Sequence, residues 1–170
     1  VEVKNLFDNY TKKYSPAYNL ALTAAFEHFT AMMAESLFSE RDVMAPAHEK
    51  VRAMWAWHAI EEMEHKAVAF DVLQNIAKSS YRNRVGSMLL VTILFPFHVF
   101  RIMKHMLEVD GFSRWPRTKI WAKGLWWLYK PGGLYMPILG HFLAYFKPGF
   151  HPWQTGQLHG HGVWLETFNR

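Results

Sequence analysis

A stretch of histidines and glutamates near the middle of the chain has the spacing of a metal-binding helix. His58, Glu61, Glu62 and His65 lie close together in the sequence. At about 100° per residue, these side chains fall within one arc of about 100° on a helix. Carboxylate oxygens and imidazole nitrogens are donors that suit iron, manganese and zinc. The spacing therefore predicts a metal site on one helical face.

The rest of this arc is apolar. It also carries Val51, Met54, Ala69 and Val72. Solvated charges usually lie opposite the apolar stripe of a helix, and burying them without partners costs several kcal/mol. A metal ion would compensate the buried carboxylates and imidazoles. The alternative is a pair of core histidines held by local carboxylates.

The spacing within the arc is specific. Glu62 and His65 form the Glu-x-x-His pair with which ferritin-like bundles ligate di-iron and di-manganese centres. His58 lies one turn earlier on the same side, whereas Glu64 points away. Glu61 could bridge or replace a ligand, or act as a general base. We therefore expect His58, Glu62 and His65 to be metal ligands.

A preceding helix offers one more ligand. Residues 17–38 contain no Gly or Pro and follow Ser15-Pro16, a typical helix entrance. Glu27 lies in the middle of this helix among small side chains, which leave room for an ion and a substrate. The alternative is a close helix–helix contact with Glu27 at its edge. The short loop 39–46 predicts an antiparallel return into one long helix over 47–78, which brings the histidine cluster level with Glu27.

These elements predict an all-α fold, namely a ferritin-like helical bundle or only its C-terminal half. Residues 1–80 would form a helical hairpin with half of the metal site, 81–108 an apolar helix, and 109–170 short aromatic-rich helices with a loop tail. We expect a break at Asp110-Gly111, followed by helices over 116–129 and 134–146 that Pro131-Gly132-Gly133 separates. The tail histidines have no helical ligand spacing and are interpreted as structural: His151, His159 and His161.

Composition limits the classes of protein and of metal site. Hydrophobic residues make up 51% of the 170 residues, which excludes a disordered protein. The absence of cysteine excludes disulfides, iron–sulfur clusters and thiolate ligands. We expect dinuclear iron as the cofactor, with manganese or zinc as alternatives. Because the chain begins with Val1, we also expect a processed chain or a fragment.

The net charge of +5 comes largely from residues between Lys78 and Lys147, where basic side chains alternate with aromatic ones. Such a mixture suits a membrane interface or a nucleic acid, and the absence of a nucleic-acid motif favours a membrane or protein partner. Residues 85–100 contain no charge. This run predicts a buried or oligomer-packing helix, a monotopic membrane contact or a short span. We expect a cytoplasmic protein, with peripheral membrane association as the alternative.

Three motifs lie at Asn19–Thr30, Trp57–Val72 and Tyr145–Trp153. They resemble a bacterial family known as predicted metal-dependent hydrolases, and the resemblance extends over most of the chain. It implies a longer protein in which further N-terminal helices supply another Glu and another Glu-x-x-His. A more distant likeness to the di-iron aryl-amine N-oxygenases is confined to the ligand pattern of Glu27, His58, Glu62 and His65.

Three functions are compatible with these observations. The first is a di-iron enzyme that uses O₂, with Glu27 and Glu62 as carboxylate ligands and His58 and His65 as nitrogen donors. The second is metal-assisted hydrolysis with Glu61 as general base. The third is a non-catalytic helical subunit that packs on a membrane or a protein complex.

One Glu helix and one Glu-x-x-His helix supply at most half the ligands of a dinuclear site. We therefore expect that the chain is not a stable monomer. A homodimer could duplicate the ligands about a two-fold axis, and a heterologous protein partner is the alternative.

Overall fold

The computed structural model describes residues 2–37 and 43–155, and these residues form helices, turns and loops without a strand. The all-α fold is therefore confirmed. Its elements are, in order, α1 (Glu2–Lys13), α2 (Pro16–Leu37), α3 (Glu49–His65), α4 (Val68–Asp71), the π-helix η1 (Val72–Ile76), α5 (Tyr81–Val109), α6 (Arg114–Tyr129), α7 (Leu139–Ala144) and the 3₁₀ helix η2 (Pro152–Gln154). The ferritin-like arrangement and the division at residues 80 and 108 stay predictions.

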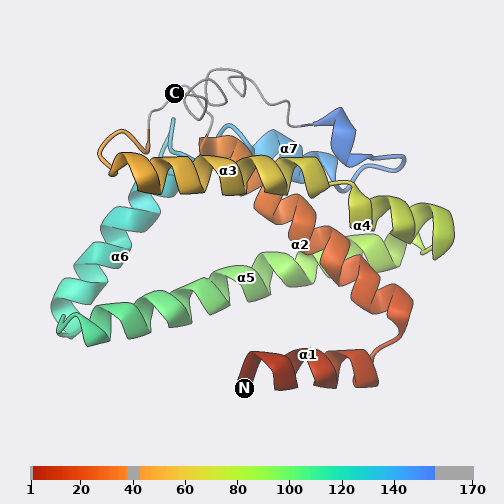
Figure 1. Ribbon diagram of the computed structural model, residues 1–170, viewed down its shortest axis with the longest axis horizontal. Helices are drawn as coiled ribbons and strands as arrows, with labels where there is room; N and C mark the ends of the chain where they lie inside the picture. Colours follow the sequence, from red (N-terminus) through yellow and green to blue (C-terminus); the bar gives the residue numbers. More distant parts are fainter. Residues whose placement is uncertain (1, 38–42, 156–170) are drawn as a thin grey trace.

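Helix α2 is the centre of the molecule, and α3, α4 and α5 pack against it (Figure 1). It begins as its sequence predicts, because Pro16 occupies the first position and the Ser15 hydroxyl accepts a hydrogen bond from the Tyr18 amide at 3.2 Å. Small side chains on α2 then let its neighbours approach closely. Ala21, Ala24 and Ala25 are completely buried.

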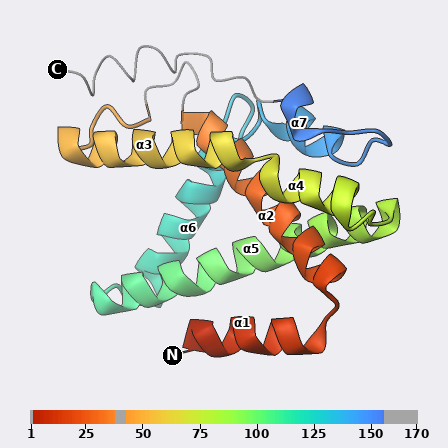
Figure 2. The ribbon, with the colours of Figure 1, turned by 45° about the vertical axis from the view of Figure 1, so that its right-hand side comes forward.

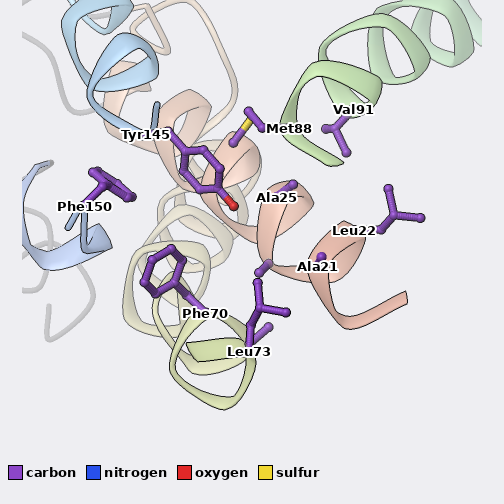
Figure 3. Packing of buried hydrophobic residues seen from close by; sticks show 11 residues of the cluster. Ala21, Leu22, Ala25, Phe70, Leu73, Met88, Val91, Tyr145 and Phe150 are labelled. Atoms are coloured by element: carbon purple, nitrogen blue, oxygen red, sulfur yellow. The ribbon is translucent and has the colours of Figure 1, made fainter. Parts of the chain in front are cut away.

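The main core lies where α2, α4, η1 and α5 meet, and the C-terminal segment closes it. Phe70 and Leu73 approach α2 from one side, and Tyr145 and Phe150 from another (Figure 3). Met88 of α5 completes the cluster. A smaller cluster of Ala31, Ala34, Ala59 and Met63 joins α2 to α3. The metal motif therefore lies on a helix that is anchored to the centre of the fold.

The expectation of one helix over 47–78 is wrong, because α3 ends at His65. The Lys66 side chain is buried and donates to the Thr155 carbonyl at 2.8 Å. The Ala69 amide donates to the Glu27 carboxylate at 3.1 Å, a tertiary bond just beyond the break. The helix resumes as α4, continues as the π-helix η1 and ends at Ile76, two residues before Lys78, whose φ is 46°. Hydrogen bonds from Lys66 and Ala69 to distant parts of the chain therefore accompany a break that the helical sequence pattern does not predict.

Helix α5 starts after the Ser80 cap and continues without a break through Pro96 to Val109. Its first half packs on α2 through Met88 and Val91, whereas its second half extends away from the core (Figures 1 and 2). Among the described residues it is the one helix long and apolar enough to cross a membrane by length and composition. The breaks predicted at Asp110-Gly111 and Pro131-Gly132-Gly133 are both present. Helix α7 is shorter than the predicted 134–146.

Candidate metal centre

The carboxylate of Glu27 lies on the side of α2 that faces the end of α3 and the start of α4. Its Oε2 accepts the Ala69 amide at 3.1 Å. Burial raises the pKa of Glu27, the Ala69 hydrogen bond lowers it, the nearby His65 lowers it and the nearby Glu62 raises it. Glu27 is therefore a partly desolvated carboxylate placed beside a second carboxylate and an imidazole.

Glu62 reaches toward α2 from α3. Its Oε2 accepts the Thr30 hydroxyl at 2.6 Å, and its Oε1 lies 3.6 Å from Nε2 of His58. The two glutamates are therefore level with each other on facing helices, as the sequence predicts. Thr30 is one of the small side chains near Glu27 that the sequence predicts to leave space. The structure shows that its hydroxyl also orients Glu62.

The second histidine of the motif pairs with a different glutamate. Nδ1 of His65 lies 3.9 Å from Oε2 of Glu61, one turn earlier on α3. Two local pairs, His58–Glu62 and Glu61–His65, therefore run along the helix side by side. Glu64 is exposed, as expected.

Over residues 2–37 and 43–155, no three His, Asp or Glu side chains are grouped closely enough to hold an ion. The common point expected for Glu27, His58, Glu62 and His65 is thus not formed by these side chains. Their assignment as ligands, and that of Glu61 as a base, stays a prediction. The structure supports it only by bringing Glu27, Glu62 and His65 within electrostatic reach of one another.

The expectation that the helical arc with His58, Glu61, Glu62 and His65 is buried is wrong for its two histidines. The side chains of His58 and His65 are 50% and 62% exposed, and Val51, Met54 and Val72 are also exposed. Helix α3 instead buries Ala56, Ala59, Ile60 and Met63. Of these, Ala59 and Met63 pack on Ala31 and Ala34 of α2, where the alanines let the two helices approach closely. His58 and His65 are left on the outer flank of the α2–α3 pair.

Sequence reasoning missed two carboxylate–histidine pairs that tie the C-terminal segment to the helices. Nδ1 of His141 lies 2.8 Å from Oε2 of Glu35, and Nε2 of His151 lies 2.9 Å from Oδ1 of Asp71. The members of each pair are far apart in the sequence, so no local spacing announces them. The His151 pair agrees with a structural role for that histidine, whereas His159 and His161 lie outside the described residues.

A family model described as "predicted metal-dependent hydrolase" matches residues 1–156. The chain belongs to this family. No curated protein and no solved structure matches the chain. Membership of the predicted metal-dependent hydrolases suggests a metal cofactor but does not identify the metal.

The side chains described above fit such a cofactor in their chemistry. The carboxylates of Glu27 on α2 and Glu62 on α3 are close enough for Glu62 to shift the pKa of Glu27, Glu27 is partly desolvated, and His65 also acts on it. Two neighbouring anions in a partly buried place favour a bound cation. Mixed carboxylate and imidazole donors suit iron, manganese and zinc, which agrees with a metal-dependent family.

Proposed function

We propose that this member of the family is a metal-dependent hydrolase whose metal is held by Glu27, Glu62 and His65, with His58 as a further donor. The observation that carries the proposal is the hydrogen bond between Thr30 of α2 and Glu62 of α3, which holds the Glu62 carboxylate one turn from Glu27, where Glu62 and His65 both shift the pKa of Glu27. A bound transition metal would polarise the bond to be cleaved, or would react with O₂ if it were iron.

The residues around the carboxylates have separate tasks in this proposal. Thr30 and the Ala69 amide each hold one carboxylate oxygen, which fixes the direction of Glu62 and Glu27. Glu61 is half exposed beside His65, where it could take a proton from water at the open flank of the helix. The exposed arc leaves space for a substrate to approach.

Metal titration of the purified protein tests the ligand assignment. Zn²⁺, Mn²⁺ and anaerobic Fe²⁺ are titrated by calorimetry, and bound metal is counted by mass spectrometry. Glu62→Gln and His65→Ala should each lower the affinity by about 10-fold or more, because each removes a donor. Glu64→Gln, an exposed position on the same helix, is the matched control and should bind like wild type. Unchanged metal content in both ligand variants would refute the site.

Activity of the metal-loaded protein separates the candidate reactions. Hydrolysis of p-nitrophenyl esters and of bis(p-nitrophenyl) phosphate should be lost in Glu61→Gln while the bound metal is retained. O₂ consumption by the Fe²⁺-loaded protein without hydrolysis would instead support the di-iron oxidation that the ligand pattern resembles. A protein that binds no metal under any of these conditions would support a non-catalytic subunit.

A further inference from the structure

The second half of α5 and all of α6 form a hairpin with almost no buried surface. No residue of α6 is buried, and beyond Pro96 the one buried residue of α5 is Leu107. Figures 1 and 2 both show the turn between these helices far from the crossing of α2 with α5. The ring centroids of Phe100 and Trp121 are 4.6 Å apart, and Arg117 forms an ion pair with Glu108. We call residues 97–127 the hairpin arm.

The turn at the end of the hairpin arm presents large apolar side chains to the outside. Val109 and Trp115 are 72% and 77% exposed, and Met106 and Phe112 are exposed as well. The backbone of this turn is well defined, because Gly111 adopts a φ of 80° and the Phe112 amide donates to the Leu107 carbonyl at 3.0 Å. The fold therefore holds these side chains at a tip instead of burying them.

In the hairpin arm α5 is amphipathic. Arg101 and Lys104 lie along one side of the helix, and apolar side chains lie along the other side. The apolar residues Ile102, Met106 and Val109 are all exposed. A helix with a basic side and an exposed apolar side is typical of segments that lie in the interface of a membrane, with the apolar side toward the acyl chains.

The charge of the hairpin arm and its surroundings favours an anionic surface. Residues 95–130 contain seven basic side chains and two acidic ones, a net charge of +5 that equals the charge of the whole chain. The basic residues are Arg101, Lys104, Arg114, Arg117, Lys119, Lys123 and Lys130. Of the two acids, Glu108 is already paired with Arg117. Exposed Trp126, Trp127 and Tyr129 lie among the lysines, a mixture that suits the headgroup level of a membrane.

We propose that the hairpin arm binds the surface of an anionic membrane, with the tip formed by Val109, Phe112 and Trp115 inserted at the boundary between headgroups and acyl chains. The contact is monotopic. The first half of α5 is packed on α2 through Met88 and Val91 and is not free to cross the bilayer. The basic residues flank the tip at the level of the phosphates.

Vesicle flotation tests the lipid partner. The full chain is mixed with vesicles of phosphatidylcholine alone or of phosphatidylcholine with phosphatidylglycerol. Binding to the anionic vesicles should be stronger by about 10-fold or more and should weaken at high salt, since the attraction is screened. The double variant Val109→Ser/Trp115→Ser should lose most of the binding. Trp57→Ser, an exposed tryptophan on α3, is the matched control and should retain it.

A fluorescent probe locates the contact. Because the chain has no cysteine, Phe112→Cys and Trp57→Cys each create a unique site for an environment-sensitive nitrobenzoxadiazole label. The label at 112 should shift to the blue on anionic vesicles and become protected from aqueous quenchers, whereas the label at 57 should not. Circular dichroism confirms that each variant keeps its helices.

Two outcomes would overturn the proposal. The first is equal binding of the tip variant and wild type, or a probe response at 57 instead of 112. The second is failure of the wild-type chain to float with anionic vesicles, together with sedimentation as a dimer in which the label at 112 is shielded. That result would assign the hairpin arm to a second copy of the chain.

Discussion

Two charged regions on neighbouring sides of α2 differ in how their charges are satisfied. In the first, the buried Arg84 guanidinium lies 5.1–5.7 Å from the ring centroids of Phe70, Tyr81, Tyr145 and Phe150. Its Nη2 donates to the Lys147 carbonyl at 2.8 Å. We call this the Arg84 cluster. Cation–π contacts and a backbone acceptor provide partners for its charge from within the chain.

In the second region, Glu27 and Glu62 are neighbouring carboxylates that receive one amide and one hydroxyl. The nearest imidazoles are half exposed. The difference suggests that a closed charged cluster stabilises the fold, whereas an open one is suited to an external cation. Each prediction below perturbs one side of this comparison.

The largest effect is expected in the Arg84 cluster. Phe70→Ala should lower the free energy of unfolding by about 3–5 kcal/mol, because it removes a fully packed ring and leaves a cavity beside Tyr145, Phe150 and Arg84. Urea unfolding followed by circular dichroism measures it. Trp57→Ala, an exposed residue, should change stability by less than about 1 kcal/mol. Equal effects of the two substitutions would show that this cluster is not the stabilising centre.

A second prediction concerns pH and a histidine that packs against the Arg84 cluster. The His28 ring lies 4.9 Å from Tyr145 and 5.1 Å from Phe150, measured between centroids. Burial lowers the pKa of His28 from 6.5 to about 4; the backbone of His141 raises this pKa in part, and the charges of Lys66, His141 and Arg84 lower it further. Between these values the unfolded chain binds a proton that the folded chain does not. Stability should therefore fall by about 3 kcal/mol as the pH drops from 6.5 to 4.

Unfolding at a series of pH values measures this loss, and His28→Phe should remove it because phenylalanine does not titrate. The raised pKa of Glu27 acts in the opposite direction, since its folded form favours the proton and gains stability as pH falls. Glu27→Gln isolates that contribution. A wild-type acid dependence that survives in His28→Phe would contradict the assignment.

Local features of the fold were predictable from the sequence. The entrance of α2 at Ser15-Pro16, the break at Asp110-Gly111 and the all-α class follow from side-chain chemistry within a few residues. The break after His65 was not predictable. It depends on Lys66 reaching Thr155 and on the Ala69 amide reaching Glu27, and neither contact has a local signal.

The candidate site shows the same division. Helix periodicity predicted that Glu62 and His65 share one side of their helix. The short loop before that helix predicted that they lie at about the same height as Glu27 on α2. The pairing of His65 with Glu61 and the role of Thr30 were not predicted, because periodicity gives the direction of a side chain but not its final partner. The exposure of His58 and His65 was also not predicted. An apolar arc predicts burial only when another element covers it.

The smallest expected effect tests whether the open cluster is built for a cation. Thr30→Val keeps the branched shape of the side chain but removes the hydroxyl that donates to Glu62 at 2.6 Å. Metal affinity should fall by about 10-fold, because partners that orient a ligand contribute to binding, whereas stability should change by about 1 kcal/mol or less. Thr23→Val is the matched control, since Thr23 lies on the same helix and its hydroxyl donates to the Asn19 carbonyl at 3.1 Å. Competition with a chelating indicator measures both affinities. If the two variants bind metal equally well, Thr30 does not position a ligand, and the contrast between the open and the closed cluster loses its functional meaning.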